Sequence, residues 1–190
     1  MRLFAAIDPP SSATADLARA VEALAGEDDP RVAALRWTRP DQWHVTLGFF
    51  GEVAEPYVDE LALRLGRAAS RTPPMALRFD GVGCFPRNPR AAKVVWLGLA
   101  GDVEPLRRLA ERCAAAARRT GIEVGRQRFT PHLTIARSRP SGGTDAQRVL
   151  GWLGTFATGS WPAETLRLVH STLGATVTHE TLAEWPLGEA

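Results

Sequence analysis

The stretch RPDQWHVTL, residues 39–47, returns in the second half of the chain as RFTPHLTI, residues 128–135. Each copy places arginine, proline and an aromatic residue ahead of a histidine, which is followed by an apolar residue, a threonine and a second apolar residue. His44 and His132 lie almost half of the 190-residue chain apart. A duplicated lobe would produce this spacing. We therefore expect two pseudo-symmetric lobes, each contributing one histidine.

Both copies have the pattern of a β-strand that places histidine and threonine together. Alternate side chains of a strand point to opposite faces, so His44 and Thr46 would share one face and the apolar residues after them would be buried behind. His132 and Thr134 would do the same in the second copy. If the two strands meet across a pseudo-twofold axis, they form a central cleft with two imidazoles and two hydroxyls.

Such a cleft suits the chemistry of a phosphodiester. A neutral imidazole can take a proton from a nucleophile on one side of phosphorus, while a protonated imidazole donates to the departing oxygen on the other. The hydroxyls can donate hydrogen bonds to the non-bridging oxygens, where negative charge builds up. This chemistry requires no metal ion and no cofactor.

Histidine with threonine two residues later is not by itself a specific pattern in this chain. It occurs at all four histidines, as HVTL, HLTI, HSTL and HETL. Only the first two copies carry an apolar residue between histidine and threonine, and only they share the lead-in. A lone strand histidine is more often structural than catalytic, whereas a matched pair in similar surroundings favours catalysis by His44 and His132.

The rest of the chain alternates short apolar strands with amphipathic helices, which favours an α+β fold with antiparallel sheets. We expect strands at residues 3–7, 45–50, 75–82, 92–99, 133–136, 166–173 and 176–185. We expect helices at residues 102–120 and 145–156, along the apolar face from Val58 to Ala68, and along the face of Leu17, Val21 and Leu24 after a cap at Ser11-Ser12.

The last two strands are expected to form a hairpin around Gly174-Ala175. A two-residue turn there would place His170 opposite His179. Two imidazoles without a carboxylate or thiol make a poor dedicated metal site. A cross-strand polar pair is therefore the simpler interpretation, although the pair could hold a stray metal ion.

Composition narrows the class of protein. With 45% hydrophobic and 23% charged residues and a net charge of +2, the chain is not disordered, and it lacks the basic runs of a sequence-independent nucleic-acid binder. Cys84 and Cys113 follow no metal-ligand spacing and are expected to be reduced core thiols. The apolar start is too short for a signal peptide, and no apolar run is long enough to span a membrane. We expect a monomer in the cytoplasm.

Beyond these features, the sequence resembles the two-histidine phosphoesterase superfamily. It is most similar to the branch of bacterial and archaeal RNA 2′,3′-cyclic phosphodiesterases, historically called 2′-5′ RNA ligases. The stretches that carry the resemblance span nearly the whole chain: RLFAAIDPP, WHVTLGFFGEV, the stretch from Gly83 to Leu97, the helix from Val103, RFTPHLTIAR, and Leu168 to Leu187.

The resemblance implies that residues 1–190 form one domain, bilobal and α+β. It implies that His44 donates a proton to the leaving oxygen, that His132 activates water, and that Thr46 and Thr134 grip the phosphate. The implied reaction opens 2′,3′-cyclic phosphates at RNA ends to a 2′-phosphate and a 3′-hydroxyl, and its reverse would join RNA ends through a 2′-5′ link. The residues alone do not decide which histidine is acid and which is base.

Two further side chains are candidates for substrate contacts. Arg137 ends the stretch HLTIAR, and the resemblance places it beside the phosphate. Plain alternation instead puts it on the face opposite His132, unless the strand twists or bulges. Phe49 could stack on a base, as aromatic residues do in readers of single-stranded RNA. At least two of Phe49, Phe50 and Phe129 are expected to pack in the core.

The chain departs from the resemblance near its end. Related sequences commonly carry a longer, proline-containing hairpin with a tyrosine, whereas this turn is Leu173-Gly174-Ala175-Thr176 and His179 lies near the place of the tyrosine. Two alternative functions stay open. One is an enzyme acting on small cyclic nucleotides or ADP-ribose cyclic phosphate, and the other is a non-catalytic module that binds RNA ends.

Overall fold

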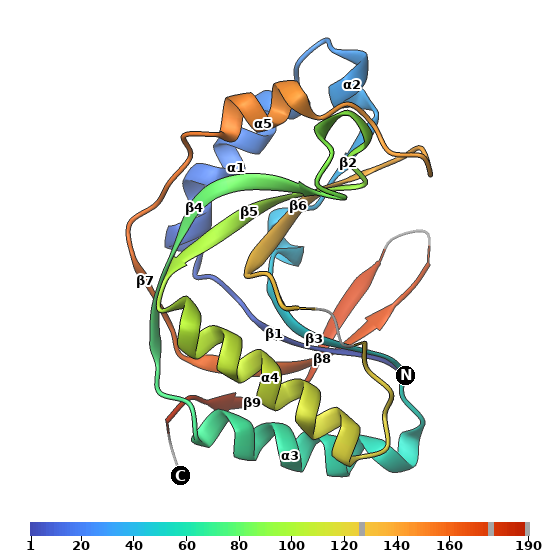
Figure 1. Cartoon of the computed structure of the whole chain (residues 1–190), viewed down its shortest axis with the longest axis vertical. Helices are drawn as coiled ribbons and strands as arrows, with labels where there is room; N and C mark the ends of the chain where they lie inside the picture. Colours follow the sequence, from blue (N-terminus) through green and yellow to red (C-terminus); the bar gives the residue numbers. More distant parts are fainter. Residues whose placement is uncertain (126–127, 175–176, 189–190) are drawn as a thin grey trace.

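The computed structural model describes residues 1–125, 128–174 and 177–188, which form two sheets with helices on the outside (Figure 1). In sheet A the order is β3 (Val45–Glu52), β1 (Arg2–Ile7), β8 (Thr165–Thr172) and β9 (Thr178–Pro186). In sheet B the order is β2 (Leu35–Trp37), β6 (His132–Ser138), β5 (Val94–Gly101), β4 (Met75–Phe85) and β7 (Trp161–Ala163). Neighbouring strands pair antiparallel in both sheets, which confirms the expected α+β class.

The helices cover the outer faces of the two sheets. Figure 1 shows α3 and α4 beside sheet A, and α1 and α5 beside sheet B. The bounds are α1 (Ser11–Ala25), α2 (Pro30–Ala33), α3 (Val58–Ser70), α4 (Val103–Arg119) and α5 (Gln147–Leu153), with 3-10 turns η1 (Pro40–Gln42), η2 (Glu55–Tyr57) and η3 (Pro89–Ala91). Gly121, with a φ of 85°, ends α4 as expected.

The expected cap of α1 is wrong. Ser11 and Ser12 already lie inside the helix, and the N-cap residue is Pro10, whose backbone is extended and whose side chain makes no cap hydrogen bond. The physical reason is the Pro9-Pro10 pair. Proline disfavours the helical conformation of the residue before it, so Pro10 keeps Pro9 out of the helix, and the helix begins directly after the pair at Ser11.

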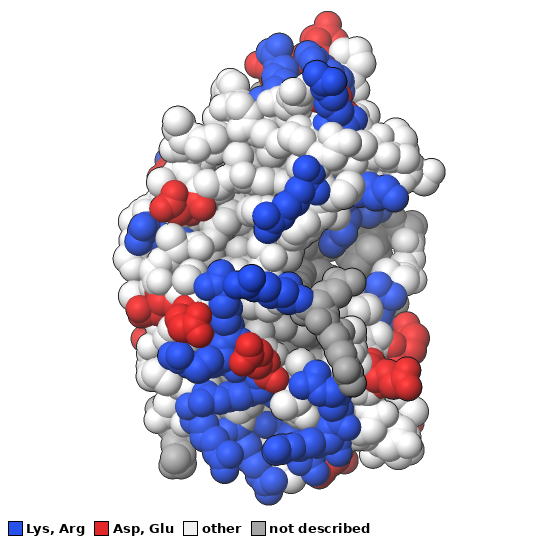
Figure 2. All heavy atoms as spheres, in the orientation of Figure 1, with Lys and Arg blue, Asp and Glu red and all other residues white. Residues whose placement is uncertain are grey.

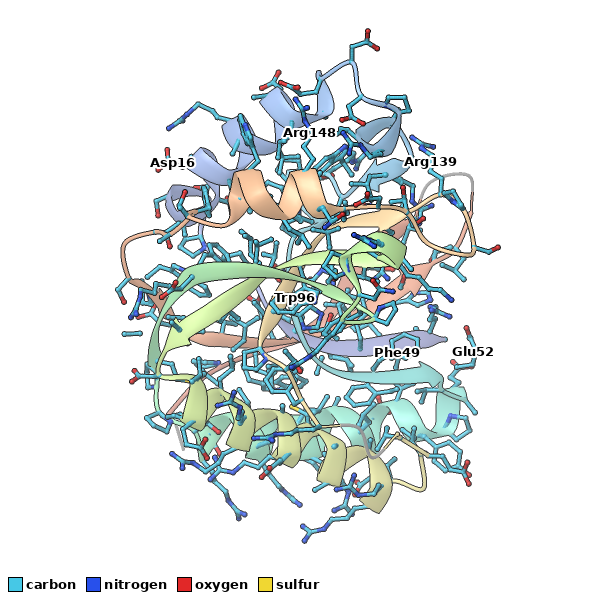
Figure 3. All side chains as sticks on the ribbon, turned by 45° about the horizontal axis from the view of Figure 1, so that its top comes forward. Asp16, Phe49, Glu52, Trp96, Arg139 and Arg148 are labelled. Carbon is cyan, nitrogen blue, oxygen red and sulfur yellow. The ribbon has the colours of Figure 1, made fainter. Side chains whose placement is uncertain are left out.

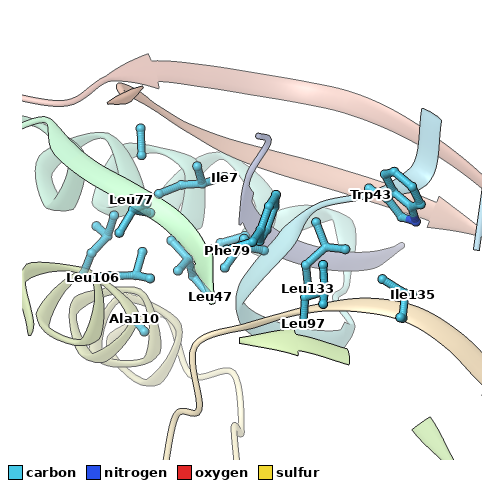
Figure 4. Close-up of a cluster of buried hydrophobic side chains, with 14 of the residues drawn as sticks. Ile7, Trp43, Leu47, Leu77, Phe79, Leu97, Leu106, Ala110, Leu133 and Ile135 are labelled. Atoms are coloured by element: carbon cyan, nitrogen blue, oxygen red, sulfur yellow. The ribbon is translucent and has the colours of Figure 1, made fainter. Parts of the chain in front are cut away.

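One continuous apolar core joins the motif strands to the helices and to both sheets (Figure 4). Leu47 of β3 and Leu133 of β6 are buried, as the alternation predicted, and Leu47 lies near α4 in the close-up. Cys84 and Cys113 are buried free thiols, which confirms that prediction. Burial raises the pKa of the Cys113 thiol to about 12, so this thiol stays protonated and unreactive.

The strands of the terminal hairpin pair, but their expected register is wrong by one residue. His170 lies opposite Glu180, and His179 lies opposite Ser171. A slip of one residue exchanges the faces of a strand. His170 therefore shares a face with Leu3 on the core side of sheet A, while His179 points the other way. The predicted pairing of the two histidines, and the stray metal site that depended on it, do not exist.

The turn that was expected at Gly174-Ala175 falls partly outside the described residues, which stop at Gly174 and resume at Val177. The register is therefore taken from the paired strands alone.

Positive side chains gather on one part of the surface. Figure 2 shows Lys and Arg concentrated over the region of α3 and α4, and the exposed arginines of these helices are Arg67, Arg108, Arg118 and Arg119. A net charge of only +2 thus conceals a local concentration of basic groups. No helix in the described part of the chain is long and apolar enough to cross a membrane.

Candidate active site

Both motif strands carry a β-bulge directly after the threonine. In β3, Thr46 and Gly48 lie opposite consecutive residues of β1, so Leu47 has no residue opposite it. In β6, Thr134 and Ala136 lie opposite consecutive residues of β5, so Ile135 is the extra residue. The two copies thus share a local backbone irregularity as well as a sequence. A bulge bends a strand and re-aims the side chains that follow.

Each motif histidine is held by the same kind of hydrogen bond. His44 Nδ1 lies 2.8 Å from the carbonyl oxygen of Gln42, and His132 Nδ1 lies 2.7 Å from that of Thr130. In each case the ring N–H donates to the carbonyl two residues earlier. This fixes the neutral tautomer and leaves Nε2 free to exchange a proton with a substrate. We call the face of each sheet that carries its motif histidine the histidine face.

Aromatic rings surround both imidazoles. On sheet A, Phe4 stacks on His44 with ring centroids 4.7 Å apart. On sheet B, Phe85 meets the His132 ring edge-on at 5.2 Å, and the Trp96 centroid lies at 5.9 Å. Figure 3 labels Trp96 in the middle of the molecule between the two layers of helices. These rings remove water from one side of each imidazole and hold its orientation.

Trp96 depends on a glycine in the neighbouring strand. Gly83 lies opposite it, and a Cβ built on Gly83 would come within 2.3 Å of the indole ring. Any other residue would displace the indole from its place beside His132. From the sequence, Gly83 could be recognised only as a glycine inside an apolar strand. Such a glycine indicates that another group approaches the backbone closely, but it does not indicate which group.

Both imidazoles are neutral in the free protein at pH 7. Burial lowers the pKa of His44 to about 4, with a further lowering from His179, Arg137 and His132 that the Gln42 carbonyl opposes. Burial and Arg137 also lower the pKa of His132. An anion placed between the rings would favour their protonated forms. The site is therefore arranged to take up a proton together with a negatively charged ligand.

The chain should unfold more easily as the pH falls from 6.5 to about 4. In this window a histidine of the unfolded chain binds a proton, whereas folded His44 stays neutral. The unfolded state then binds more protons than the folded state, so the free energy of unfolding decreases as the pH falls. Urea unfolding at successive pH values measures this slope, and His44→Gln should flatten it. A slope equal to that of wild type would remove His44 as its source.

The sequence is similar to a family of known proteins. The sequence profile of the 2′-5′ RNA ligase superfamily matches residues 9–175. The chain belongs to the 2′-5′ RNA ligase superfamily. Relatives in it include the RNA 2′,3′-cyclic phosphodiesterase of Aeropyrum pernix, which is 32% identical over 73% of this chain and 78% of its own length. The one from Escherichia coli is 32% identical over 72% of this chain and 71% of its own length.

Two solved structures share the whole fold of this chain. E. coli LigT complexed with 3′-AMP superposes with a TM-score of 0.77 at 28% identity, covering 99% of this chain and 98% of LigT. The protein TT0787 of Thermus thermophilus gives the same TM-score at 25% identity and covers 100% and 99% of the two chains. The α+β arrangement of two sheets expected from the resemblance is thus shared with these solved structures.

The bulge changes the expected position of Arg137. In a regular strand without the bulge at Ile135, Arg137 would lie on the face opposite His132. With it, Arg137 lies opposite Val94, which in turn pairs with Phe85, the ring that contacts His132. Arg137 is therefore on the histidine face, and its charge contributes to lowering the pKa of both motif histidines. The sequence left open that a bulge in the strand could bring Arg137 to the side of His132, and the structure contains this bulge.

Phe49 occupies in β3 the position that Arg137 occupies in β6, five residues after the motif histidine. It pairs with Phe4 and so lies on the histidine face, toward the Glu52 end of the strand (Figure 3). Its ring is 48% exposed, and the Arg2 guanidinium lies 4.6 Å from its centroid. Phe50 is buried and Phe129 packs against the core, as expected for two of the three phenylalanines.

Phe49→Ala should raise KM for an RNA substrate about tenfold and leave kcat nearly unchanged. Stacking of a base on an aromatic ring contributes about 1–3 kcal/mol, and the exposed ring takes no part in proton transfer. Steady-state kinetics on a short RNA ending in a cyclic phosphate measures both constants. Leu63→Ala, which removes a similarly exposed apolar side chain from α3, is the matched control. An unchanged KM in Phe49→Ala would show that no base stacks there.

Sequence reasoning missed several members of the site. Phe4 and His179 meet each other at 5.2 Å beside His44, and Phe85 and Trp96 flank His132. They come from strands distant in sequence from the motifs, so no local pattern links them. No three His, Cys, Asp or Glu side chains gather into a metal-binding group within the residues described.

Proposed function

We propose that this member of the 2′-5′ RNA ligase superfamily hydrolyses 2′,3′-cyclic phosphates at RNA ends to a 2′-phosphate and a 3′-hydroxyl. The observation that carries the proposal is the matched pair of imidazoles, each with Nδ1 bound to a backbone carbonyl and Nε2 free. The names of the relatives support the substrate. One LigT structure at 28% identity was solved with 3′-AMP, and another LigT structure was solved with phosphate.

The reaction needs one neutral and one protonated imidazole at the same time. The neutral ring takes a proton from water as the water oxygen bonds to phosphorus, and the protonated ring gives its proton to the 3′-oxygen as the bond between phosphorus and that oxygen breaks. The step leaves the base protonated and the donor neutral, so proton exchange with solvent must restore the starting state before the next turnover. Following the resemblance, we assign His44 as the donor and His132 as the base. With an RNA 5′-hydroxyl in place of water as the nucleophile, the same steps form a 2′-5′ link and release the 3′-hydroxyl.

Three further side chains are assigned to the phosphate. Thr46 and Thr134 share the histidine faces of their strands, because each precedes the bulge at the same distance from its histidine. Their hydroxyls can donate to the non-bridging oxygens as negative charge grows there. The Arg137 guanidinium supplies a positive charge on the same face, which a pentavalent transition state needs more than the cyclic diester does.

Turnover of a short RNA with a 2′,3′-cyclic end, with and without EDTA, tests the proposal together with the absence of a metal or cofactor. We expect equal rates in both conditions. Loss of activity in EDTA that zinc restores would contradict metal-free catalysis. The same assay on small cyclic nucleotides and ADP-ribose cyclic phosphate addresses the alternative enzyme, which a higher kcat/KM on those substrates would favour. Binding of RNA ends without any turnover would identify a binding module.

We further infer that the protein works as a monomer in the cytoplasm. Both motif histidines and the groups assigned to the phosphate come from one chain. The two cysteines are free and buried, which fits a reducing compartment. Sedimentation at micromolar concentration should give the mass of one chain, and a dimer mass would contradict the first part of this inference.

A further inference from the structure

The two motif histidines are held alike but have different neighbours. His132 is flanked by Phe85 and Trp96, neither of which can take up a proton. His44 is flanked by Phe4 and by His179, whose ring meets it edge-on at 5.2 Å and 74°. Among the described residues, His179 is the one aromatic neighbour of either motif histidine that ionises. It breaks the near-symmetry of the duplicated site.

The fold fixes the position of His179 in two ways. Its register opposite Ser171 places it with Thr181 on the histidine face of sheet A. Gln42 then ties the hairpin to the segment before His44. The Gln42 side-chain amide donates to the carbonyl of Val177 at 2.5 Å, while the Gln42 carbonyl accepts from His44 Nδ1. One residue thus links the backbone next to His179 to the ring of His44.

A cavity of about 90 Å³ lies beside these two histidines. The charged groups that face it are Asp8, Asp41 and Arg167. Arg167 is paired with Asp8, and Asp41 is bound by Arg39, whose Nε lies 3.0 Å from its Oδ1. Partial burial lowers the pKa of His179, and the Asp41 carboxylate opposes this lowering only in part. The remaining ionisable contact of the His179 ring is with His44 itself.

We propose that His179 is a positioning residue that makes the two motif histidines unequal, because its ionisable ring packs against His44 and has no counterpart at His132 in the part of the chain that the structure describes. A proton on His179 repels a second one on His44. As the pH of the free protein falls, a proton therefore binds His179 or His132 before it binds His44, and at pH 7 His44 acquires one only when an anionic phosphate enters. The inference rests on the proposed function only in its kinetic consequence, since the order of protonation exists without substrate.

Histidine titration by NMR tests the inference without turnover. We expect His44 to titrate at lower pH than His132 in wild type. His179→Phe keeps a ring of similar size and removes the charge, so it should raise the pKa of His44 by about one unit and leave that of His132 in place. His179→Lys puts a lasting positive charge at the same position and should move the pKa of His44 down. Equal His44 titrations in wild type and both variants would overturn the inference.

A matched control lies on the same hairpin. His170→Phe makes the same chemical change on the opposite face of β8, where the side chain lies 3.9 Å from Glu180. It should leave the titration of His44 unchanged. An equal shift in His170→Phe would show that any lost imidazole on the hairpin has this effect, and it would overturn the specific role of His179.

Kinetics add a second measurement. In His179→Phe the low-pH limb of kcat/KM should move upward by about one unit, because the lower of the two coupled pKa values belongs mainly to His44. The plateau should also rise, since a donor that binds its proton more readily is more often in the productive form. A wild type with no activity would contradict the proposed function while the NMR titration still decides the role of His179. An active wild type with a superimposable variant profile would overturn this inference alone.

Discussion

Replacing His132 by alanine should lower kcat about 10²- to 10⁴-fold, with a smaller change in KM, and His44→Ala should do the same. This is the usual loss when one partner of an acid–base pair is removed. Each ring is fixed by a hydrogen bond at Nδ1, which leaves Nε2 as the atom that we assign to proton transfer. Single-turnover assays on a cyclic-phosphate RNA measure the loss without interference from product release.

The double variant sharpens this test. In a concerted transfer, the second substitution should cost much less than the first, because half of an acid–base pair contributes little alone. His170→Ala removes a histidine from the core-side face of sheet A and is the control for folding. A His132→Ala variant that keeps more than a tenth of wild-type kcat would exclude His132 from the proton transfer.

Arg137→Ala should lower kcat/KM about 10- to 10²-fold, the second-largest effect that we expect. A charge-assisted hydrogen bond contributes about 1.5–3 kcal/mol, and the guanidinium lies on the histidine face only because of the bulge at Ile135. Arg137→Lys should recover part of the loss, because lysine keeps the positive charge. The recovery should be incomplete, because lysine lacks the planar guanidinium that donates two parallel hydrogen bonds. Removing the positive charge should also raise the pKa of His132, whose proton it now repels.

Arg139→Ala is the matched control for that variant. It removes the same side chain two residues further along, past the end of β6. Full activity in Arg137→Ala, or an equal loss in Arg139→Ala, would contradict a contact between Arg137 and the phosphate. A loss confined to Arg137 and partly restored by lysine would establish both the contact and the re-aiming of the strand.

The residues that define the site could be predicted because their pattern is local. The alternation of buried and half-buried side chains from Val45 to Leu47, and again from His132 to Ile135, is the one observed. Helix α4 was predicted almost to the residue, since its apolar face recurs at helical spacing and ends at Gly121. Such signals need no knowledge of the distant chain.

Most of the features that sequence could not predict depend on the pairing of strands. A bulge at Ile135 is defined by the strand opposite, as is the register that separates His170 from His179. The short strands β2 and β7, each of three residues, are held by their neighbours and have too few residues to show a period. Helix α5 begins two residues later and ends three residues earlier than its apolar pattern indicated.

The aromatic setting of the histidines illustrates the same limit. Trp96 and Phe85 read as ordinary strand residues, and only antiparallel pairing of β4, β5 and β6 brings them to His132. His179 could be noted only as a departure from a resemblance. Its contact with His44 appears when the hairpin register is known.

The most direct test of the account is to identify the end group made by wild type from a short RNA carrying a 2′,3′-cyclic phosphate, in EDTA, beside His44→Ala. Phosphorus NMR distinguishes a 2′-phosphate from a 3′-phosphate. We predict a 2′-phosphate with a free 3′-hydroxyl from wild type and almost no product from the variant. A 3′-phosphate, or equal product from both proteins, would contradict the roles given to the two histidines.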